Sequence, residues 1–251
     1  MNVALNTFEI AGDRYAVRPL RDRELADRAR WRQLDDHGRW SSEPVTGAIV
    51  GEWISDSPSL FFDQRIEGDY IWQVRVARLK PDAAFLARFA ANKHAQGCDP
   101  RTKYNFNLWL RADSPPGSGE NFLQAYPKHL GTGWNGMGDD HWQSLFNTVV
   151  WNGPSTGHAL GGLTNWVRLR KSPGYVQVCE AIDVVPHLPY DQPHLFTFAV
   201  SSRLGRVRMY YDACRVYDYA DAAIPGAGYL GLCVWLCVMR FDQMRLYQWM
   251  S

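Results

Sequence analysis

The segment YNFNLWLRA (Tyr104–Ala112) decides the fold class, because its side chains alternate between two kinds. Every second residue from Phe106 to Leu110 is apolar, and the opposite set is Asn105, Asn107, Trp109 and Arg111. Successive side chains of a β-strand point to opposite faces, so this segment predicts a strand with one face in a core. The other face carries amides, an indole and a guanidinium group instead of the Lys, Glu, Thr and Ser of an ordinary solvent face.

Similar short runs recur along the chain, separated by turn-forming Gly and Pro residues. We expect further strands at Ser59–Asp63, Tyr70–Leu79, Trp142–Trp151, Trp166–Arg170, Tyr175–Ala181, His194–Ser201, Arg206–Asp212, Arg215–Tyr219, Gly228–Met239 and Phe241–Gln248. Two segments are predicted to be helical, Asp22–Gln33 and Pro81–Gln96, the second with Asp82 as its N-cap. Many strands and little helix predict an all-β jelly-roll sandwich of two antiparallel sheets with short helical embellishments.

The length of 251 residues suits one domain with a full-sized core. We therefore predict a single jelly-roll domain spanning residues 1–251. Residues 1–50 are expected to form an N-terminal extension with the first strands, and residues 81–101 and 114–140 are expected to be insertions. A loop as long as the second insertion is usually functional or mobile in a compact domain.

The charge pattern argues against several classes of partner. The 27 basic and 26 acidic residues give a net charge of +1 and form no basic block, which disfavours nucleic-acid binding. No apolar run reaches the roughly 18 residues that span a bilayer, which disfavours a membrane partner. The start, Met1–Gly12, lacks a basic region and contains Glu9, so no export signal is visible and a cytoplasmic location is expected.

The cysteines and histidines predict no metal enzyme. Five cysteines are an odd number without a CxxC pair, so we expect free buried thiols instead of a disulfide framework. The seven histidines show no H-x-x-x-H spacing, which disfavours zinc. We expect no cofactor, although a structural calcium ion bound by loop acids away from the site stays open.

The outward-facing mix of Asn, Arg and Trp recurs in four predicted strands, in a chain that is 14% aromatic. Indoles stack on sugar rings, and amides and guanidinium groups hydrogen-bond to hydroxyls, so the mix is typical of a saccharide-binding sheet. The candidate substrate-binding residues are Asn105, Asn107, Trp109, Arg111, Asn147, Trp151, Trp166, Arg168, Arg170 and Trp235. The alternative is that these tryptophans pack under loops and the arginines are solvated charges.

The candidate catalytic residues are Glu180 and His141. Glycosidases need two carboxylates around the scissile bond, and the strand pattern E-x-D-x-E that supplies them in many jelly-roll glucanases is absent. Glu180 lies in an apolar stretch that would suit a general acid, or it is a structural carboxylate paired with an arginine. A lyase would instead use His141 or Tyr104 as a base, with Arg and Asn neutralising a uronate carboxylate.

Several motifs carry a resemblance to a known family. They are residues 104–112, WQSLFNTVVW (142–151), WVRLRKSPGY (166–175), Cys179-Glu-Ala, the hairpin 205–219 and the closing segment from Gly228 to Tyr247. Together they resemble the YesU-like family of concanavalin-A-like sandwich proteins over roughly residues 50–249. The segment R-L-R-x-x-P-G-Y, followed by a Glu, is the most specific piece.

The resemblance implies a two-sheet jelly roll whose concave face handles carbohydrate, in a family often encoded beside pectin and rhamnogalacturonan utilisation genes. It supplies no catalytic set. From the repeated Asn, Arg and Trp face, together with this resemblance, we predict an enzyme that cleaves a glycosidic bond in an oligosaccharide of pectic or rhamnogalacturonan type. The enzyme would be a hydrolase or a lyase. The alternatives are a non-catalytic carbohydrate-binding protein, and a structural role in which the aromatic face forms a protein interface such as a homodimer contact.

Overall fold

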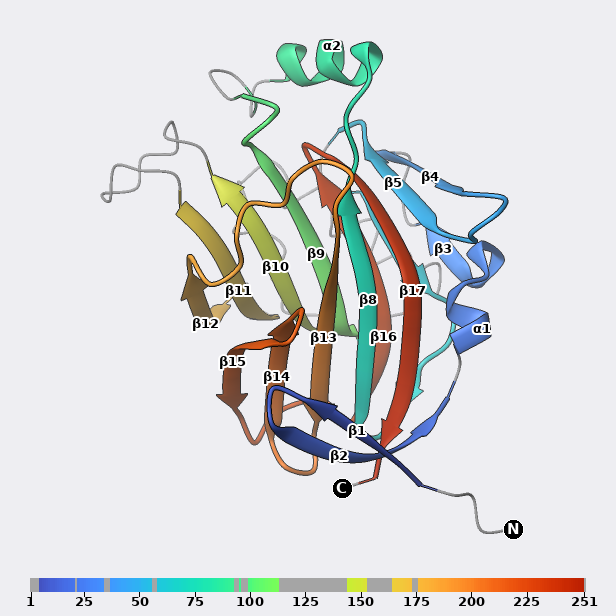
Figure 1. The fold of residues 1–251 in the computed structure, drawn as a ribbon, viewed down its shortest axis with the longest axis vertical. Helices are drawn as coiled ribbons and strands as arrows, with labels where there is room; N and C mark the ends of the chain where they lie inside the picture. The colour runs from blue at the N-terminus through green and yellow to red at the C-terminus, as the bar shows by residue number, and fades with distance from the viewer. Residues whose placement is uncertain are drawn as a thin grey trace.

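A computed structural model describes residues 5–20, 22–33, 37–55, 58–92, 95, 99–112, 144–152, 164–172 and 176–250. For residues 144, 146, 148, 150–152, 164 and 172 it describes the main chain alone. The described strands form two antiparallel sheets that stack face to face (Figure 1). The predicted all-β sandwich is therefore confirmed.

The first layer is a nine-stranded sheet. Its main path runs through β1 (Asn6–Ile10), β2 (Asp13–Pro19), β17 (Val238–Trp249), β8 (Tyr70–Arg78), β13 (Pro193–Ser201), β14 (Arg206–Tyr211) and β15 (Cys214–Ala220). Two further strands, β4 (Gly38–Ser42) and β5 (Ile49–Trp53), join it because β5 pairs with β17.

The second layer is an eight-stranded sheet. Its path runs through β12 (Val176–Ile182), β11 (Thr164–Ser172), β10 (Ser144–Asn152), β9 (Tyr104–Ala112), β16 (Ala227–Trp235), β6 (Ser59–Phe62) and β3 (Trp31–Gln33). The short strand β7 (Ile66–Glu67) pairs with β16. We call the side of each sheet that is turned away from the other sheet its outward face.

The core lies between the sheets and is built by the alternation that the sequence shows. Phe106 and Leu108 of β9 are fully buried against the nine-stranded sheet, where Phe196 and Phe198 of β13 face them. The rings of Phe106 and Phe196 meet edge to face, with their centroids 5.5 Å apart. Burying a large apolar side chain contributes roughly 1.5–3 kcal/mol, so these inward sets fix the register of both sheets.

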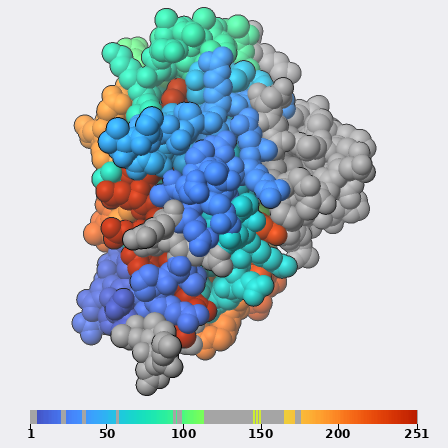
Figure 2. All heavy atoms as spheres, turned by 90° about the vertical axis from the view of Figure 1, so that its right-hand side faces the viewer, coloured from blue at the N-terminus to red at the C-terminus, as the bar shows by residue number. Residues whose placement is uncertain are grey.

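The first two strands of the chain, β1 and β2, extend the nine-stranded sheet. The hairpin of β1 and β2 crosses the outward face of this sheet, as Figure 1 shows in blue. Tyr15 and Val17 pack there against Ile71 and Tyr210 in a second small core. Figure 2 shows that the blue N-terminal segment covers much of one side of the molecule, below the green α2 (Ala83–Ala91).

The two predicted helices have different outcomes. Helix α2 begins after Asp82, whose carboxylate accepts a hydrogen bond from the Phe85 N–H at 2.7 Å, so this N-cap is confirmed. The helix predicted over Asp22–Gln33 is wrong: it divides into α1 (Asp22–Leu25), a 3₁₀ turn and strand β3. Pairing with β6 overrides local helix propensity at Trp31–Gln33.

The long strand predicted over Gly228–Met239 is also divided in two. β16 ends at Trp235 and β17 begins at Val238, because Leu236 adopts a left-handed backbone conformation (φ 56°) that turns the chain from one sheet to the other. Sequence alternation carries no sign of this turn, since Leu and Cys are compatible with a strand.

Other sequence-based expectations concern cysteines and membranes. Cys179, Cys214, Cys233 and Cys237 are free thiols, and Cys214 is exposed, which corrects the expectation that all are buried. Cys98 lies outside the described residues. In the part of the chain that the structure describes, no helix is long and apolar enough to cross a membrane.

Candidate functional site

Most of the predicted site residues lie on the outward face of the eight-stranded sheet, in cross-strand rows. Residues that oppose each other in an antiparallel sheet share a face. In the middle row, Arg168 pairs with Glu180 on one side and position 148 on the other, and position 148 also pairs with Asn107. Asn107 in turn pairs with Cys233. The row thus runs across five strands, from β12 to β16.

Two neighbouring rows complete this face. One joins Trp166 through position 150 to Asn105 and then Trp235. The other joins Arg170 through position 146 to Trp109 and Gly231. The predicted residues therefore meet on one side of one sheet. We call this surface, from Glu180 to Trp235, the Asn–Arg–Trp face.

Burial on the Asn–Arg–Trp face decreases toward strand β12. At its centre, Asn107 and Trp109 are fully buried, and Trp235 is 8% exposed. Toward β12 the side chain of Arg168 is 16% exposed and that of Glu180 is 24% exposed. The face therefore has a buried centre and an accessible end at β11 and β12.

The indoles of this face are covered by other side chains, which differs from the expected open stacking surface. The Trp109 ring lies 5.7 Å from the Phe61 ring, and both rings pack directly on Gly231, where an added Cβ would be within 3 Å of each. The Lys103 ammonium lies 5.5 Å from the Trp235 ring centroid. The Arg168 guanidinium lies over Trp166 at 3.9 Å.

Asn105 and Asn107 each have a side-chain oxygen that accepts no hydrogen bond from the described residues. The Asn107 amide nitrogen donates to the Cys233 sulfur at 3.4 Å. Within the described structure, the Oδ1 atoms of both Asn105 and Asn107 are buried without a hydrogen-bond partner. A buried unpaired amide oxygen costs about 1–3 kcal/mol unless a water or ligand donates to it. A sugar hydroxyl is a donor of the required kind.

Glu180 is held by its neighbours and is not surrounded by apolar groups. Its carboxylate lies 3.5 Å from the Arg168 Nη2 atom and accepts a hydrogen bond from the Gln177 amide. The expected apolar setting is wrong because Val178, Cys179 and Ala181 turn toward the core, whereas Glu180 faces outward beside Arg168. This geometry fits the alternative of a structural carboxylate paired with an arginine.

Two predicted binding residues lie elsewhere. Arg111 lies in a bulge of β9 opposite Tyr229–Gly231 and is fully buried, with its guanidinium 4.4 Å from the Tyr70 ring. It donates to the carbonyls of Ile66, at 2.8 Å, and Gly68. Burial lowers the pKa of Arg111 and raises that of Tyr70. Arg111 therefore stabilises the turn between β7 and β8 instead of belonging to the Asn–Arg–Trp face.

Asn147 is the second such residue. It is fully buried, and its Oδ1 accepts a hydrogen bond of 2.9 Å from the hydroxyl of Tyr217 on β15, across the core between the sheets. Its neighbours in the alternation, Leu145 and Val149, are core residues, so the sequence already carried this signal. His141 lies outside the described residues, and of Trp151 only the main chain is described, pairing with Tyr104 and Asn165.

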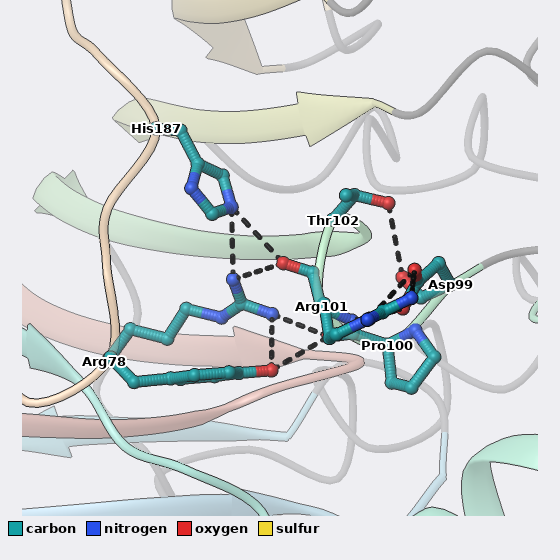
Figure 3. A network of polar contacts seen from close by, with 7 residues as sticks. Arg78, Asp99, Pro100, Arg101, Thr102 and His187 are labelled. Carbon is teal, nitrogen blue, oxygen red and sulfur yellow. Dashed lines mark hydrogen bonds and ion pairs between the residues drawn. The ribbon is translucent and has the colours of Figure 1, made fainter.

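A clamp built around Arg78 supports the start of β9, and sequence reasoning missed it. Arg78 is 2% exposed and lies between the rings of Tyr104 and Tyr190, at 4.3 and 4.4 Å. Its guanidinium donates to the carbonyls of Pro100 and of Arg101, the latter at 2.7 Å (Figure 3). The segment that leads to Lys103 and Asn105 is thus fixed by a residue of the other sheet.

His187 closes the clamp. Its Nε2 lies 3.1 Å from both the Arg78 Nη1 and the Arg101 carbonyl oxygen (Figure 3). Burial and the adjacent Arg78 charge lower the pKa of His187.

The Cys237 thiol holds the main chain of β9. It donates to the Asn105 carbonyl at 3.2 Å, and burial raises the pKa of this thiol to about 12. The described residues contain no group of three or more His, Cys, Asp or Glu side chains that could hold a metal ion.

Comparisons with known proteins place the fold. No family model matches this sequence, and no curated protein matches it. A Bacillus subtilis protein of unknown function with a galectin-like fold aligns over 98% of both chains, with 12% identity and a TM-score of 0.58. The calcium- and mannose-bound exoplasmic/lumenal domain of VIP36 aligns over 88% of this chain and 84% of that chain, with 13% identity and a TM-score of 0.56.

A third similar structure is the carbohydrate-binding module CBM66 from Bacillus subtilis. It aligns over 86% of this chain and 94% of its own, with 12% identity and a TM-score of 0.52. At these identities the likeness concerns the arrangement of strands. The chain therefore has a galectin-like, concanavalin-A-like β-sandwich fold.

Proposed function

We propose that this protein binds a carbohydrate on the Asn–Arg–Trp face of the eight-stranded sheet. The observation that carries the proposal is the pair of buried, unpaired amide oxygens of Asn105 and Asn107 beside the indoles of Trp109 and Trp235. Amide oxygens of this kind accept hydrogen bonds from saccharide hydroxyls, and the adjacent indoles belong to the same face although other side chains cover their rings. In this proposal, the ligand enters at the accessible end beside Arg168. The side chains that cover the centre of the face move aside, and ligand hydroxyls then donate to both amide oxygens.

The comparisons support a saccharide ligand by analogy of fold. CBM66 is a carbohydrate-binding module, and the VIP36 domain is described with bound mannose. A fold hosts many functions, so the weight of the proposal rests on the side chains of the face. The resemblance of the sequence to the YesU-like family supports the same ligand class and extends it to pectic or rhamnogalacturonan oligosaccharides.

Binding is favoured over cleavage by the carboxylates of the face. Glu180 is the one carboxylate in the sequences of β9, β10, β11, β12 and β16. Most glycosidases use two carboxylates on either side of the bond. Glu180 is also engaged by Arg168 and Gln177. Hydrolysis or elimination with Glu180 and His141 as acid and base is therefore the second candidate, after binding without turnover.

The test compares two buried amides, one on each sheet. Asn107→Leu removes an amide whose oxygen is unpaired, and Gln73→Leu removes an amide that donates to Thr197 Oγ1 at 3.2 Å on the outward face of the nine-stranded sheet. Glycan-array screening followed by calorimetry on the best ligand should show binding by the wild type and by Gln73→Leu. Binding by Asn107→Leu should be at least about tenfold weaker.

Two results would count against the proposal. Absence of binding to any neutral or acidic glycan on the array would remove the carbohydrate assignment. Equal affinities of Asn107→Leu and the wild type would move the site away from this face. Release of reducing ends or of an unsaturated product by the wild type, lost in Glu180→Gln, would establish the second candidate instead.

A further inference from the structure

The Arg168 guanidinium is held in place but weakly neutralised. It lies over the Trp166 indole, with its central carbon 3.9 Å from the ring centroid, so its plane is supported by a cation–π contact. Its distance to the Glu180 carboxylate is 3.5 Å, whereas charge-assisted N–H···O bonds in proteins are roughly 2.7–2.9 Å long. Among the described residues, its Nε atom is buried without a hydrogen-bond partner.

Glu180, by contrast, does not depend on Arg168. The Gln177 amide donates a hydrogen bond to its second oxygen, and the side chain is 24% exposed to water. If Arg168 were engaged by another anion, Glu180 would keep the Gln177 hydrogen bond and its solvation. The pair is therefore arranged so that its cation can take a different partner at small cost.

Among the described residues, the charged side chains of the Asn–Arg–Trp face are mostly basic. The described charged side chains at the Asn–Arg–Trp face are Lys103, Arg168 and Arg170 against Glu180. The whole chain, by comparison, has 27 basic and 26 acidic residues. This composition of the described residues favours an anionic ligand over a cationic one.

We propose, building on the carbohydrate assignment above, that the saccharide bound by this face carries an anionic group and that Arg168 is the residue that recognises it. The Arg168 guanidinium, held over the Trp166 ring, donates from its Nε and Nη atoms to two oxygens of the group, and Glu180 remains bonded to Gln177. A planar fork of donors matches a carboxylate or a sulfate ester, which share this chemistry. Arg168 thereby selects acidic over neutral sugars.

The experiment uses matched probes and the full chain. Calorimetric titrations compare tetragalacturonate with its neutral methyl ester, which has the same backbone, and add a sulfated oligosaccharide and a glycan-array hit without charge. The proteins are the wild type, Arg168→Gln, Arg168→Lys and Glu180→Gln. The control is Arg215→Gln on strand β15, which removes an exposed guanidinium group from the other sheet. Circular dichroism confirms that each variant is folded.

The wild type should bind an acidic probe about ten- to a hundredfold more tightly than the neutral ester, as one charge-assisted contact allows. Whether the carboxylated or the sulfated probe binds more tightly identifies the source of the anion. Arg168→Gln should abolish the preference, Arg168→Lys should restore only part of it, and Arg215→Gln should leave it intact. Glu180→Gln should strengthen acidic binding, because it removes the competing carboxylate.

Failure of this inference is distinguishable from failure of the carbohydrate assignment. If the wild type binds the acid and its ester equally, the anionic specificity is refuted and the carbohydrate assignment stands. If an acidic preference persists in Arg168→Gln, Arg168 is not the recognising residue. If the wild type binds neither charged nor neutral glycans, both proposals fall together.

Discussion

The outward faces of the two sheets differ in how their carboxylate and amide groups are paired. On the nine-stranded sheet, Asp242 lies between Arg75 and Arg240, with a 3.1 Å contact to the latter. Asp218 contacts Arg206 at 2.7 Å and Arg208 at 3.1 Å. On the eight-stranded sheet, two amide oxygens are unpaired and one guanidinium group is weakly paired. The charges of the first face are mostly paired with each other, although the Nε atoms of Arg206 and Arg240 are also buried without a partner in the described structure. The second face has the open acceptors that the proposed ligand site requires.

This contrast has a general physical meaning. Hydrogen bonds between two groups of the protein stabilise the fold. Buried polar groups without a partner lower stability, and a ligand that binds to them raises it again. We therefore expect substitutions on the nine-stranded sheet to lower the free energy of unfolding and leave binding intact. Substitutions on the Asn–Arg–Trp face should weaken binding with little effect on stability. The following predictions compare the faces, from the largest expected effect on the free energy of unfolding to the smallest.

The largest loss should follow Asp242→Ala on the nine-stranded sheet. The carboxylate is 6% exposed, and its removal leaves the Arg75 and Arg240 charges facing each other. We expect about 2–4 kcal/mol of destabilisation in urea denaturation, with glycan binding retained. The control Asp242→Asn keeps the volume and should lose less. A loss of glycan binding in folded Asp242→Ala would contradict the separation of the two faces.

A smaller loss should follow acidification, through His187 in the Arg78 clamp. Because the pKa of His187 in the folded protein is lowered, the unfolded chain binds the proton more readily. This contribution to stability is complete above the ordinary value of 6.5 and is lost as the pH falls through the lowered pKa. Denaturation curves between about pH 5 and pH 8 should show it in the wild type and not in His187→Gln.

The His187→Gln comparison has a clear contrary outcome. Parallel stability profiles of the two proteins across this range would show that the imidazole is not the responsible group. Because the clamp fixes the segment before β9, glycan binding by the wild type should weaken over the same pH interval. Unchanged binding would separate the clamp from the Asn–Arg–Trp face.

The next largest change in the free energy of unfolding should come from the two amide variants, Gln73→Leu and Asn107→Leu. Gln73→Leu leaves the Thr197 hydroxyl without its amide donor and should cost about 1 kcal/mol. Asn107→Leu removes an unpaired acceptor, so its unfolding free energy should stay constant or rise by up to ~1 kcal/mol while binding is lost. Thermal melts with and without glycan test this opposition. Equal destabilisation by both changes would show that the Asn107 oxygen is satisfied in solution.

The smallest change should follow Glu180→Gln. The ion pair with Arg168 is 3.5 Å long and lies at the accessible end of the face. Partly exposed pairs of this kind contribute ~0–1 kcal/mol. We expect no change in the denaturation midpoint beyond that range. If Glu180→Gln lowered the free energy of unfolding as much as Asp242→Ala does, Glu180 would be essential for stability. The proposal that Arg168 leaves Glu180 to bind an anionic ligand would then be wrong.

The sequence predicted the sandwich and the shared face, because both depend on alternation within single strands. Asn105, Asn107 and Trp109 fall on the expected side of β9 for this reason. Arg111 was predicted on the same face but points elsewhere, because a bulge in β9 changes the direction of its side chain. No residue type in the sequence indicates this bulge. The clamp of Arg78 unites segments around residues 78, 101 and 187, and such contacts between distant segments leave no periodic signal. Burial of the indoles likewise depends on tertiary neighbours.

The place of the last strands has a consequence for biosynthesis. β17 lies inside the nine-stranded sheet between β8 and the pair β2 and β5, and β16 lies inside the other sheet between β9 and β6. Residues 227–249 thus complete the middle of both layers. A nascent chain that has not yet emerged to Trp249 exposes the edges of β8 and β9 that β17 and β16 later cover, and these non-local pairings form only after that segment is translated. Chaperone protection during synthesis is the expected requirement.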